Sequence, residues 1–285
     1  MALIVLLAAS VLMTSSVSAS RAAFASRCSV WPMPRDIACG GSTLRVAPEF
    51  AFASASASPL LRRAFARYEA LLLLNCSGDA AAGGGAAPLP LLHGVDVRVA
   101  SDSEELQVGT REDHNLTVPG GRGGGRGTIA ASTVYGALHA MQSLSQLVAR
   151  CELPCAPLAI ADAPRFKWRG LMVDTSRHFL SAERLKQTVG AMEESKMNVL
   201  HLHLSDYQSF PLALQSLPLL AEGGAFRASN GCRSPYNPMD GGGGLNGSRC
   251  VHTMAELADL VAYAKAYIRI PAVNFLSNSL LFILK

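Results

Sequence analysis

Two short clusters of polar and charged residues directly follow apolar runs in the second half of the chain. Asp174 and Arg177 come after the run GLMV at 170–173, and Asp206 follows the run VLHLHL at 199–204. Continuous apolar runs are typical of strands covered on both faces. Side chains that follow such strands gather at one edge of an α/β sheet, where binding sites form.

These residue types suit the recognition of hydroxyl groups. The planar guanidinium of Arg177 offers several donors in a fixed arrangement, which fits the vicinal hydroxyls of a sugar. Asp206 is placed to accept a substrate hydroxyl or to orient a histidine. The competing interpretation is structural: Asp174 and Arg177 form an ion pair that only fixes the loop, because a buried carboxylate needs a partner.

His201 and His203 raise the question of metal binding. Alternate positions on a strand put both imidazoles on one face. A catalytic zinc site usually has three protein ligands, and His178 is the other histidine near a predicted strand end. We therefore expect supporting histidines, no metal and no cofactor. A metal-dependent barrel hydrolase that uses His201 and His203 stays as an alternative hypothesis.

The elements around these clusters alternate between strand and helix. Strands are predicted at 170–174, 198–204 and 268–273. One helix begins after Ser181, and another begins at a capping box formed by Thr253 and Glu256. Such a βαβαβ series opens either a doubly wound sheet or a (β/α)₈ barrel.

The first half of the chain has a different pattern. Ser58 followed by proline is typical of a helix start, and a second helix is predicted at 134–148. Short strands are predicted around 95–99, 106–108, 116–118 and 128–130, after an irregular stretch that contains 31–34. This helix–strands–helix order predicts a small α+β domain over residues 28–160.

Several features favour the secretory route, with an extracellular, lysosomal or vacuolar destination. Residues 1–19 have the composition of a cleaved signal peptide. Asn75, Asn115 and Asn246 begin N-glycosylation sequons. The 285-residue chain has a net charge of +4 without a dense basic run, so we expect no nucleic-acid partner. The apolar segment 276–284 is too short to cross a bilayer, so we expect no membrane span.

Seven cysteines are present, and in an oxidising compartment most of them would pair. Cys232 and Cys250 flank a segment rich in glycine and asparagine, so they are candidates for a disulfide that closes it. Cys151 and Cys155 could tie a short turn. The spacings do not fit a zinc motif.

The polar clusters belong to two longer motifs, DAPRFKWRGLMVDTSRHFL at 162–180 and KMNVLHLHLSD at 196–206. Together with QSFPL at 208–212, they closely resemble the β-N-acetylhexosaminidases of glycoside hydrolase family 20. A weaker resemblance covers 134–138 and 145–148. The resemblance implies an accessory α+β domain at 28–160, followed by the first, incomplete part of a (β/α)₈ TIM barrel at 165–271.

The resemblance also implies an activity, namely the removal of terminal β-linked N-acetylglucosamine or N-acetylgalactosamine from glycans. The family retains the anomeric configuration by a substrate-assisted mechanism. Arg177 matches the arginine that binds hydroxyls of the terminal sugar. Asp206 matches an aspartate that supports the acid through a later histidine. A homodimer is implied for the full-length family.

The chain departs from the family pattern at specific positions. Leu202 stands where tryptophan is usual, and Tyr207 stands where a second aspartate is usual. The pattern is lost after Tyr267, and 272–285 is a divergent tail. The catalytic Asp-Glu pair has no counterpart, because Glu104-Glu105 and Glu193-Glu194 fall in a predicted sheet region and on a predicted helix. We therefore expect this chain alone to be inactive, with a non-catalytic sugar-binding or partner protein as the alternative.

Overall fold

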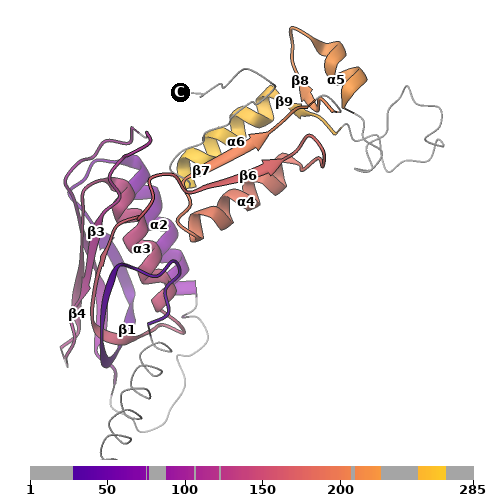
Figure 1. Ribbon diagram of the computed structural model, residues 1–285. Coiled ribbons are helices and arrows are strands. Elements are labelled where there is room, and N and C mark those ends of the chain that lie inside the picture. The colour runs from indigo at the N-terminus through magenta and orange to yellow at the C-terminus, as the bar shows by residue number, and fades with distance from the viewer. Residues whose placement is uncertain are drawn as a thin grey trace, which may run out of the picture. The chain divides into compact units, whose positions relative to one another are not determined.

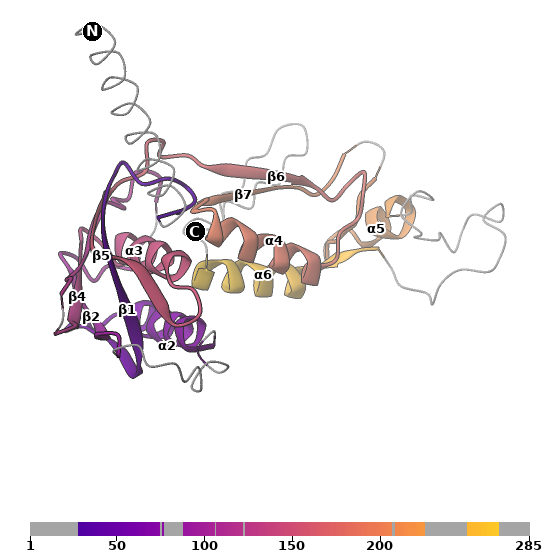
Figure 2. The same cartoon turned by 90° about the horizontal axis from the view of Figure 1, so that it is seen from below.

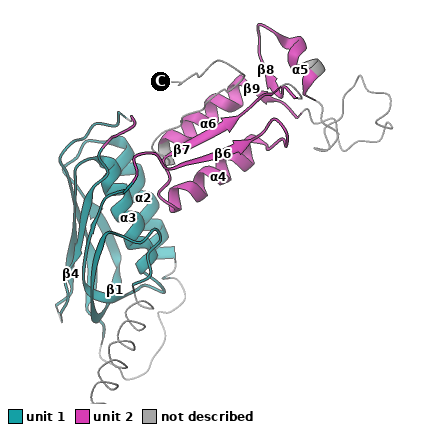
Figure 3. Ribbon diagram, viewed as in Figure 1, with its two compact units in different colours: residues 1–105, 111–165 teal, residues 106–110, 166–285 magenta. Residues whose placement is uncertain are grey.

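The computed structural model describes residues 28–74, 76, 88–105, 107–121, 123–206, 209–225 and 250–267. The chain divides into two compact units (Figure 3). Unit 1 contains residues 1–105 and 111–165, and unit 2 contains residues 106–110 and 166–285. The predicted signal peptide at 1–19, the predicted strand at 268–273 and the tail at 272–285 lie outside the described residues.

Unit 1 is built around a five-stranded sheet (Figure 1). Its strands are β1 (Asp36–Ala53), β2 (Leu91–Val99), β3 (His114–Val118), β4 (Gly125–Ala131) and β5 (Glu152–Asp162). They follow the order β1-β2-β4-β3-β5, and the sheet closes on itself. The closure depends on the 18-residue β1, which pairs with β5 through its first part and with β2 through its second part.

Two helices, α2 (Pro59–Leu74) and α3 (Val134–Leu147), lie side by side against the sheet (Figure 1). The predicted cap of α2 is confirmed, since Ser58 Oγ accepts a hydrogen bond from the Leu61 N–H at 3.1 Å. The hydroxyl of Tyr68 on α2 donates to the side-chain oxygen of Gln142 on α3 at 2.9 Å, within the core. This bond satisfies two buried polar groups and fixes the pairing of the helices.

The sequence predictions for unit 1 are right in part. The predicted strands at 95–99, 116–118 and 128–130 lie within β2, β3 and β4. The predicted strand at 106–108 is wrong, because a turn occupies positions 108–109. The long strands β1 and β5 were not predicted. Gly40 and Gly41 interrupt the apolar pattern of β1, at the place where its register with β5 shifts.

The structure pairs the cysteines of unit 1 as Cys28–Cys39 and Cys76–Cys151. The expected Cys151–Cys155 bond is therefore wrong: Cys151 is bonded to Cys76, next to the end of α2, and Cys155 is a buried free thiol in β5. Local spacing suggested the wrong partner because Cys76 lies 75 residues away in sequence. The predicted partner of Cys250 is Cys232, which lies outside the described residues.

Unit 2 begins with a strand, a helix and a second strand: β6 (Gly170–Asp174), α4 (Ala182–Glu194) and β7 (Val199–His203). The two strands are parallel, as predicted, and Asp174 pairs with His203 at their carboxyl ends. α6 (Met254–Tyr267) packs beside α4 on the same face of the two strands (Figures 1 and 2). The core between them contains Leu185, Val189, Met192, Leu200, Leu202, Leu257 and Leu260.

The predicted helix starts of unit 2 are confirmed. Ser181 Oγ accepts from the Arg184 N–H at 3.4 Å. Thr253 and Glu256 form the reciprocal capping box: Thr253 N–H donates to Glu256 Oε2 at 2.8 Å, and Glu256 N–H donates to Thr253 Oγ1 at 3.1 Å. Three short elements complete the described part of the unit, namely β8 (Leu212–Ala213), α5 (Pro218–Gly224) and β9 (His252–Thr253), with β8 and β9 paired in parallel.

Within the described residues, no helix has both the length and the apolar character needed to cross a membrane.

Candidate functional site

The loops that follow β6 and β7 meet at the carboxyl ends of these strands. Arg177, in the loop after β6, lies between two carboxylates. Its Nε contacts Asp174 Oδ2, and its Nη1 lies 3.0 Å from Asp206 Oδ2. The structure thus brings together the predicted site residues Arg177 and Asp206, and it also contains the ion pair of the competing structural interpretation.

Asp174 fixes the loop through its backbone as well as through the ion pair. Its Oδ1 accepts hydrogen bonds from the N–H groups of Ser176 and Arg177, each at 3.0 Å. Burial by itself raises the pKa of Asp174, but these hydrogen bonds and the charge of Arg177 lower that pKa overall. Asp174 is therefore ionised at neutral pH and holds the turn in one conformation.

The second loop is attached to the first by hydrogen bonds. Ser176 is buried, and its hydroxyl donates to the carbonyl of Ser209 at 2.9 Å. Asp206 Oδ1 accepts from the Ser209 N–H at 3.1 Å, which closes a short turn. The Asp206 side chain is only 10% exposed, whereas that of Arg177 is 45% exposed. The result is a rigid polar edge from which one arginine reaches solvent.

His201 and His203 lie on the face of β7 opposite the leucine core, because Leu200 and Leu202 between them are buried against the helices. The Nε2 atoms of both histidines are buried and have no hydrogen-bond partner among the described residues. In the part of the chain that is described, they are not joined by a third His, Cys, Asp or Glu at metal-binding distance. The geometry of this face gives no support to the metal-dependent alternative.

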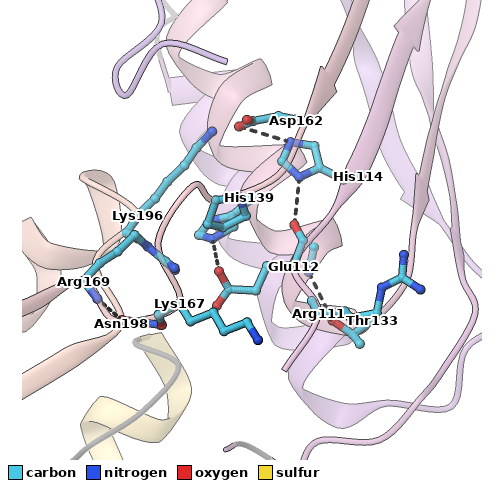
Figure 4. Close-up of polar contacts among 12 residues, drawn as sticks. Arg111, Glu112, His114, Thr133, His139, Asp162, Lys167, Arg169, Lys196 and Asn198 are labelled. Atoms are coloured by element: carbon cyan, nitrogen blue, oxygen red, sulfur yellow. Dashed lines mark hydrogen bonds and ion pairs between the residues drawn. The ribbon is translucent and has the colours of Figure 1, made fainter. Parts of the chain in front are cut away.

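At the amino ends of β6 and β7, other motif residues have structural roles (Figure 4). The side-chain oxygen of Asn198 accepts from the Arg169 N–H at 2.8 Å, and its amide donates to the carbonyl of Lys167 at 2.8 Å. Arg169 Nε donates to the carbonyl of Lys196 at 2.8 Å. These contacts set the register of the two strands. The candidate binding residues lie at the opposite, carboxyl ends of the strands.

The acidic pairs considered in the sequence do not belong to the loops that follow β6 and β7. Glu104 is in a loop of unit 1, where its Oε1 accepts from the Leu60 N–H at 2.8 Å and so caps α2. Glu193 and Glu194 end α4, as predicted. In the described residues, none of these glutamates belongs to the cluster around Arg177.

Sequence reasoning overlooked the adjacent acidic residues Glu112 and Asp113 in unit 1. Glu112 is buried, and its Oε2 lies 3.4 Å from Nε2 of the buried His139 (Figure 4). Next to this pair, His114 Nε2 lies 4.0 Å from Asp162 Oδ2. Local sequence patterns do not indicate such pairs, because their members come from the loop before β3, from β3 and β5, and from α3. The structure gives these residues a buried structural role in unit 1, since buried polar side chains need polar neighbours.

Comparison with known proteins shows which family this chain resembles. Residues 166–271 match the glycosyl hydrolase family 20 catalytic domain, and residues 30–147 match the family described as beta-acetyl hexosaminidase like. Among curated proteins, the chain is similar to beta-hexosaminidase 3 of Arabidopsis thaliana, with 36% identity over 212 residues, which are 69% of this chain and 39% of the relative.

Solved structures show the same likeness. A chitobiase of Flavobacterium johnsoniae aligns with a TM-score of 0.62 at 23% identity over 86% of this chain and 34% of its own. A β-N-acetylhexosaminidase of Streptomyces coelicolor aligns with a TM-score of 0.57 at 27% identity, over 85% of this chain and 45% of its own. The chain belongs to glycoside hydrolase family 20 and contains the accessory domain and part of the catalytic domain. It spans less than half the length of these relatives.

Proposed function

We propose that this chain forms the sugar-gripping part of an enzyme that removes terminal β-linked N-acetylglucosamine or N-acetylgalactosamine from glycans. One observation carries the proposal: Arg177 is fixed by Asp174 and Asp206 at the carboxyl ends of β6 and β7 and still reaches solvent. A planar donor group held in one orientation suits the adjacent hydroxyls of a pyranose ring.

The proposed mechanism of the whole enzyme is retaining and substrate-assisted. The acetamido oxygen of the substrate attacks the anomeric carbon, an aspartate orients the acetamide, and a glutamic acid protonates the leaving oxygen. In this chain, Arg177 would donate to hydroxyls of the terminal sugar, and Asp206 would act through a histidine. No Asp-Glu dipeptide occurs in the 285 residues. We therefore infer that the chain by itself binds the sugar without hydrolysing it.

Three further features belong to the same proposal. Unit 2 is the beginning of a (β/α)₈ barrel, and the full-length enzyme is a homodimer. The protein follows the secretory route, which the two disulfides of unit 1 support. Asn115 is exposed on β3, where a glycan would point away from the buried neighbours of that strand. Asn75 and Asn246 lie outside the described residues.

A binding experiment on the purified chain tests the role of Arg177. We expect saturation-transfer NMR to detect N-acetylglucosamine on the unmodified chain. Arg177→Lys keeps the charge but loses the fork of donors, and it should weaken binding about tenfold or more. Lys186→Ala, which removes the ion pair with the exposed Asp259, is the control and should bind normally. Equal binding by the Arg177→Lys chain would contradict the proposed site.

Hydrolysis is tested separately with a fluorogenic β-N-acetylglucosaminide. We expect the purified chain to release no fluorophore above the uncatalysed rate, since the catalytic acid has no counterpart in it. Release that depends on Arg177 would show that a different acid operates and would overturn the inferred inactivity.

A further inference from the structure

Three cysteines of unit 1 meet in one place, outside the candidate site. The Sγ atoms of Cys28, Cys39 and Cys155 all lie within 4.8 Å of one another. Cys28 and Cys39 are joined as a disulfide, and Cys155 is a free thiol. Cys28 and Cys155 are buried, and Cys39 is partly buried. A free thiol therefore sits beside a disulfide in a protected environment.

The sheet holds two of these cysteines on neighbouring strands. Cys39 is in β1 and Cys155 is in β5, and the strands pair on both sides of a register shift, through Cys39 with Leu158 and through Ser42 with Ala156. At Gly40, inside this shift, a Cβ atom would lie only 2.2 Å from the Ala156 carbonyl oxygen. The two backbones thus approach closely beside the sulfur atoms. Cys28, in contrast, precedes β1 and lies outside the sheet.

From this arrangement we propose that Cys155 is an alternative partner of Cys39, so that the Cys28–Cys39 disulfide exchanges for a Cys39–Cys155 disulfide. The Cys155 thiolate attacks Sγ of Cys39, a new S–S bond forms, and the Cys28–Cys39 bond breaks. Cys28 leaves as a thiolate and takes up the proton that Cys155 lost. One disulfide and one thiol are present before and after the step, so it needs neither an oxidant nor a reductant.

The exchange would change which parts of unit 1 the disulfide connects. Cys28–Cys39 ties the segment before β1 to that strand, across 11 residues. Cys39–Cys155 would instead cross-link β1 to β5, at the seam that closes the sheet. A bond that closes the longer loop constrains the unfolded chain more strongly in the chain-entropy account. It would also remove the covalent tie of the segment that contains Cys28, which would then be held by the two hydrogen bonds between the Trp31 backbone and the Gln146 side chain.

The burial of Cys155 determines when the disulfide exchange can occur. Burial raises the pKa of the Cys155 thiol to about 11, so little thiolate forms in the closed unit at neutral pH. Exchange therefore belongs to oxidative folding and to transient opening of unit 1, when the sulfur atoms meet water.

Disulfide mapping of the full chain tests the proposal. The chain is refolded in a glutathione redox buffer, alkylated under denaturing conditions without reduction, digested and analysed by mass spectrometry. In the unmodified chain we expect both Cys28–Cys39 and Cys39–Cys155 peptides. In Cys28→Ser we expect the Cys39–Cys155 peptide to become the main form, with little alkylation of either cysteine.

Two controls keep the outcome interpretable. The Cys76–Cys151 peptide reports in every variant that unit 1 has folded. Cys39→Ser removes the shared partner and should leave Cys28 and Cys155 alkylated. The proposal is overturned if folded Cys28→Ser keeps Cys39 and Cys155 as free thiols. It is equally overturned if Cys39→Ser forms a Cys28–Cys155 bond as readily as Cys28→Ser forms the Cys39–Cys155 bond.

Discussion

The guanidinium of Arg177 is oriented by two carboxylates, Asp174 and Asp206, that differ in solvent exposure. The Asp174 side chain is 23% exposed and the Asp206 side chain is 10% exposed, and each contacts a different nitrogen of the guanidinium. Two fixed contacts set the plane of the group as well as its position. A group oriented in advance loses little conformational entropy on binding, which is why the structural ion pair and a binding role are compatible.

A first prediction concerns the partner of Arg177 on its own loop. Asp174→Asn removes the ion pair and weakens two backbone hydrogen bonds, so we expect unit 2 to lose about 1–3 kcal/mol of stability. The pKa of Asp174 is lowered in the folded state, so its contribution is present at neutral pH and is lost as the pH falls through that pKa. Urea unfolding followed by the fluorescence of Trp168 measures the loss.

Asp259→Asn is the matched control for this experiment. Asp259 also pairs with a cation, Lys186, but its side chain is 63% exposed. Exposed ion pairs contribute about 0–1 kcal/mol, so this variant should unfold close to the unmodified chain. If both variants lose the same stability, the Asp174 turn is not the anchor that the geometry indicates.

A second prediction concerns acid stability. His252 is buried, its ring centroid lies 4.6 Å from that of Phe179, and burial lowers its pKa from 6.5 to about 4. The unfolded chain therefore binds an additional proton between these values, so stability is present above pH 6.5 and is lost as the pH falls toward 4. The difference corresponds to on the order of 3 kcal/mol.

Comparing the unfolding free energy at pH 7 and at pH 4.5 tests this effect. We expect His252→Phe to remove a large part of the pH dependence, because no proton can be taken up on unfolding. His178→Phe changes an exposed histidine and should keep the dependence. An unchanged slope in His252→Phe would place the acid sensitivity elsewhere.

At the scale of the elements, β1 closes the sheet of unit 1, because it pairs with β2 on one side and with β5 on the other. Its pairing with β5 passes through Gly40 and Gly41, which differ in their surroundings. A Cβ at position 40 would collide with the Ala156 backbone, whereas nothing lies within 4 Å of a Cβ at position 41. One glycine is therefore required by close approach, and the other is not.

The third prediction uses this pair of glycines. Gly40→Ala should force β1 and β5 apart and destabilise unit 1 by about 3 kcal/mol or more, since overpacking against a backbone cannot be relieved by a rotamer change. Gly41→Ala should change stability by less than about 1 kcal/mol. Thermal unfolding followed by circular dichroism distinguishes them, and equal melting temperatures would contradict the close approach.

The local parts of the fold could be predicted from the sequence. Caps at Ser58, Ser181 and Thr253 depend on residues three or four positions apart, so their signals lie within one turn. The strands of unit 2 were equally clear, because an uninterrupted apolar run has few alternatives. For the same reason, the positions of Arg177 and Asp206 after these strands were predicted correctly. The expectation that both faces of these strands are covered is wrong for β6, since Met172 is 55% exposed and no residue of β6 is buried.

The non-local parts could not be predicted. Nothing in the sequence of β1 indicates that it bends between two partners, and its glycines suggest a loop. The hydrogen bond from Ser176 to the Ser209 carbonyl joins residues 33 positions apart, so the rigidity of the candidate site was not visible. The Cys76–Cys151 pairing likewise depends on where α2 ends relative to β5.

At the scale of the whole molecule, the two units differ in how fully their sheets are completed. The described part of unit 1 has a closed sheet, two packed helices and two disulfides. In the described residues of unit 2, β6 and β7 form a two-stranded sheet, and Met172 on the face opposite the core is 55% exposed. Small sheets with open edges are marginally stable.

The fourth prediction follows from this contrast. Limited proteolysis of the full chain should remove unit 2 first and leave a fragment of about residues 28–165, because cleavage follows the population of open states. Intact-mass measurement over time under non-reducing conditions identifies the fragment. Loss of both units at the same rate would show that they unfold together.

The Cys76–Cys151 bond has a consequence for the covalent integrity of the molecule. Cys76 follows α2 and Cys151 precedes β5, so β2, β3, β4 and α3 lie inside one closed covalent ring. A single backbone cut within that ring, for example between 107 and 113, would create two polypeptides without releasing either. The cut protein would migrate as one species until a reductant opened the bond. Until then, it would consist of two polypeptides joined by one disulfide.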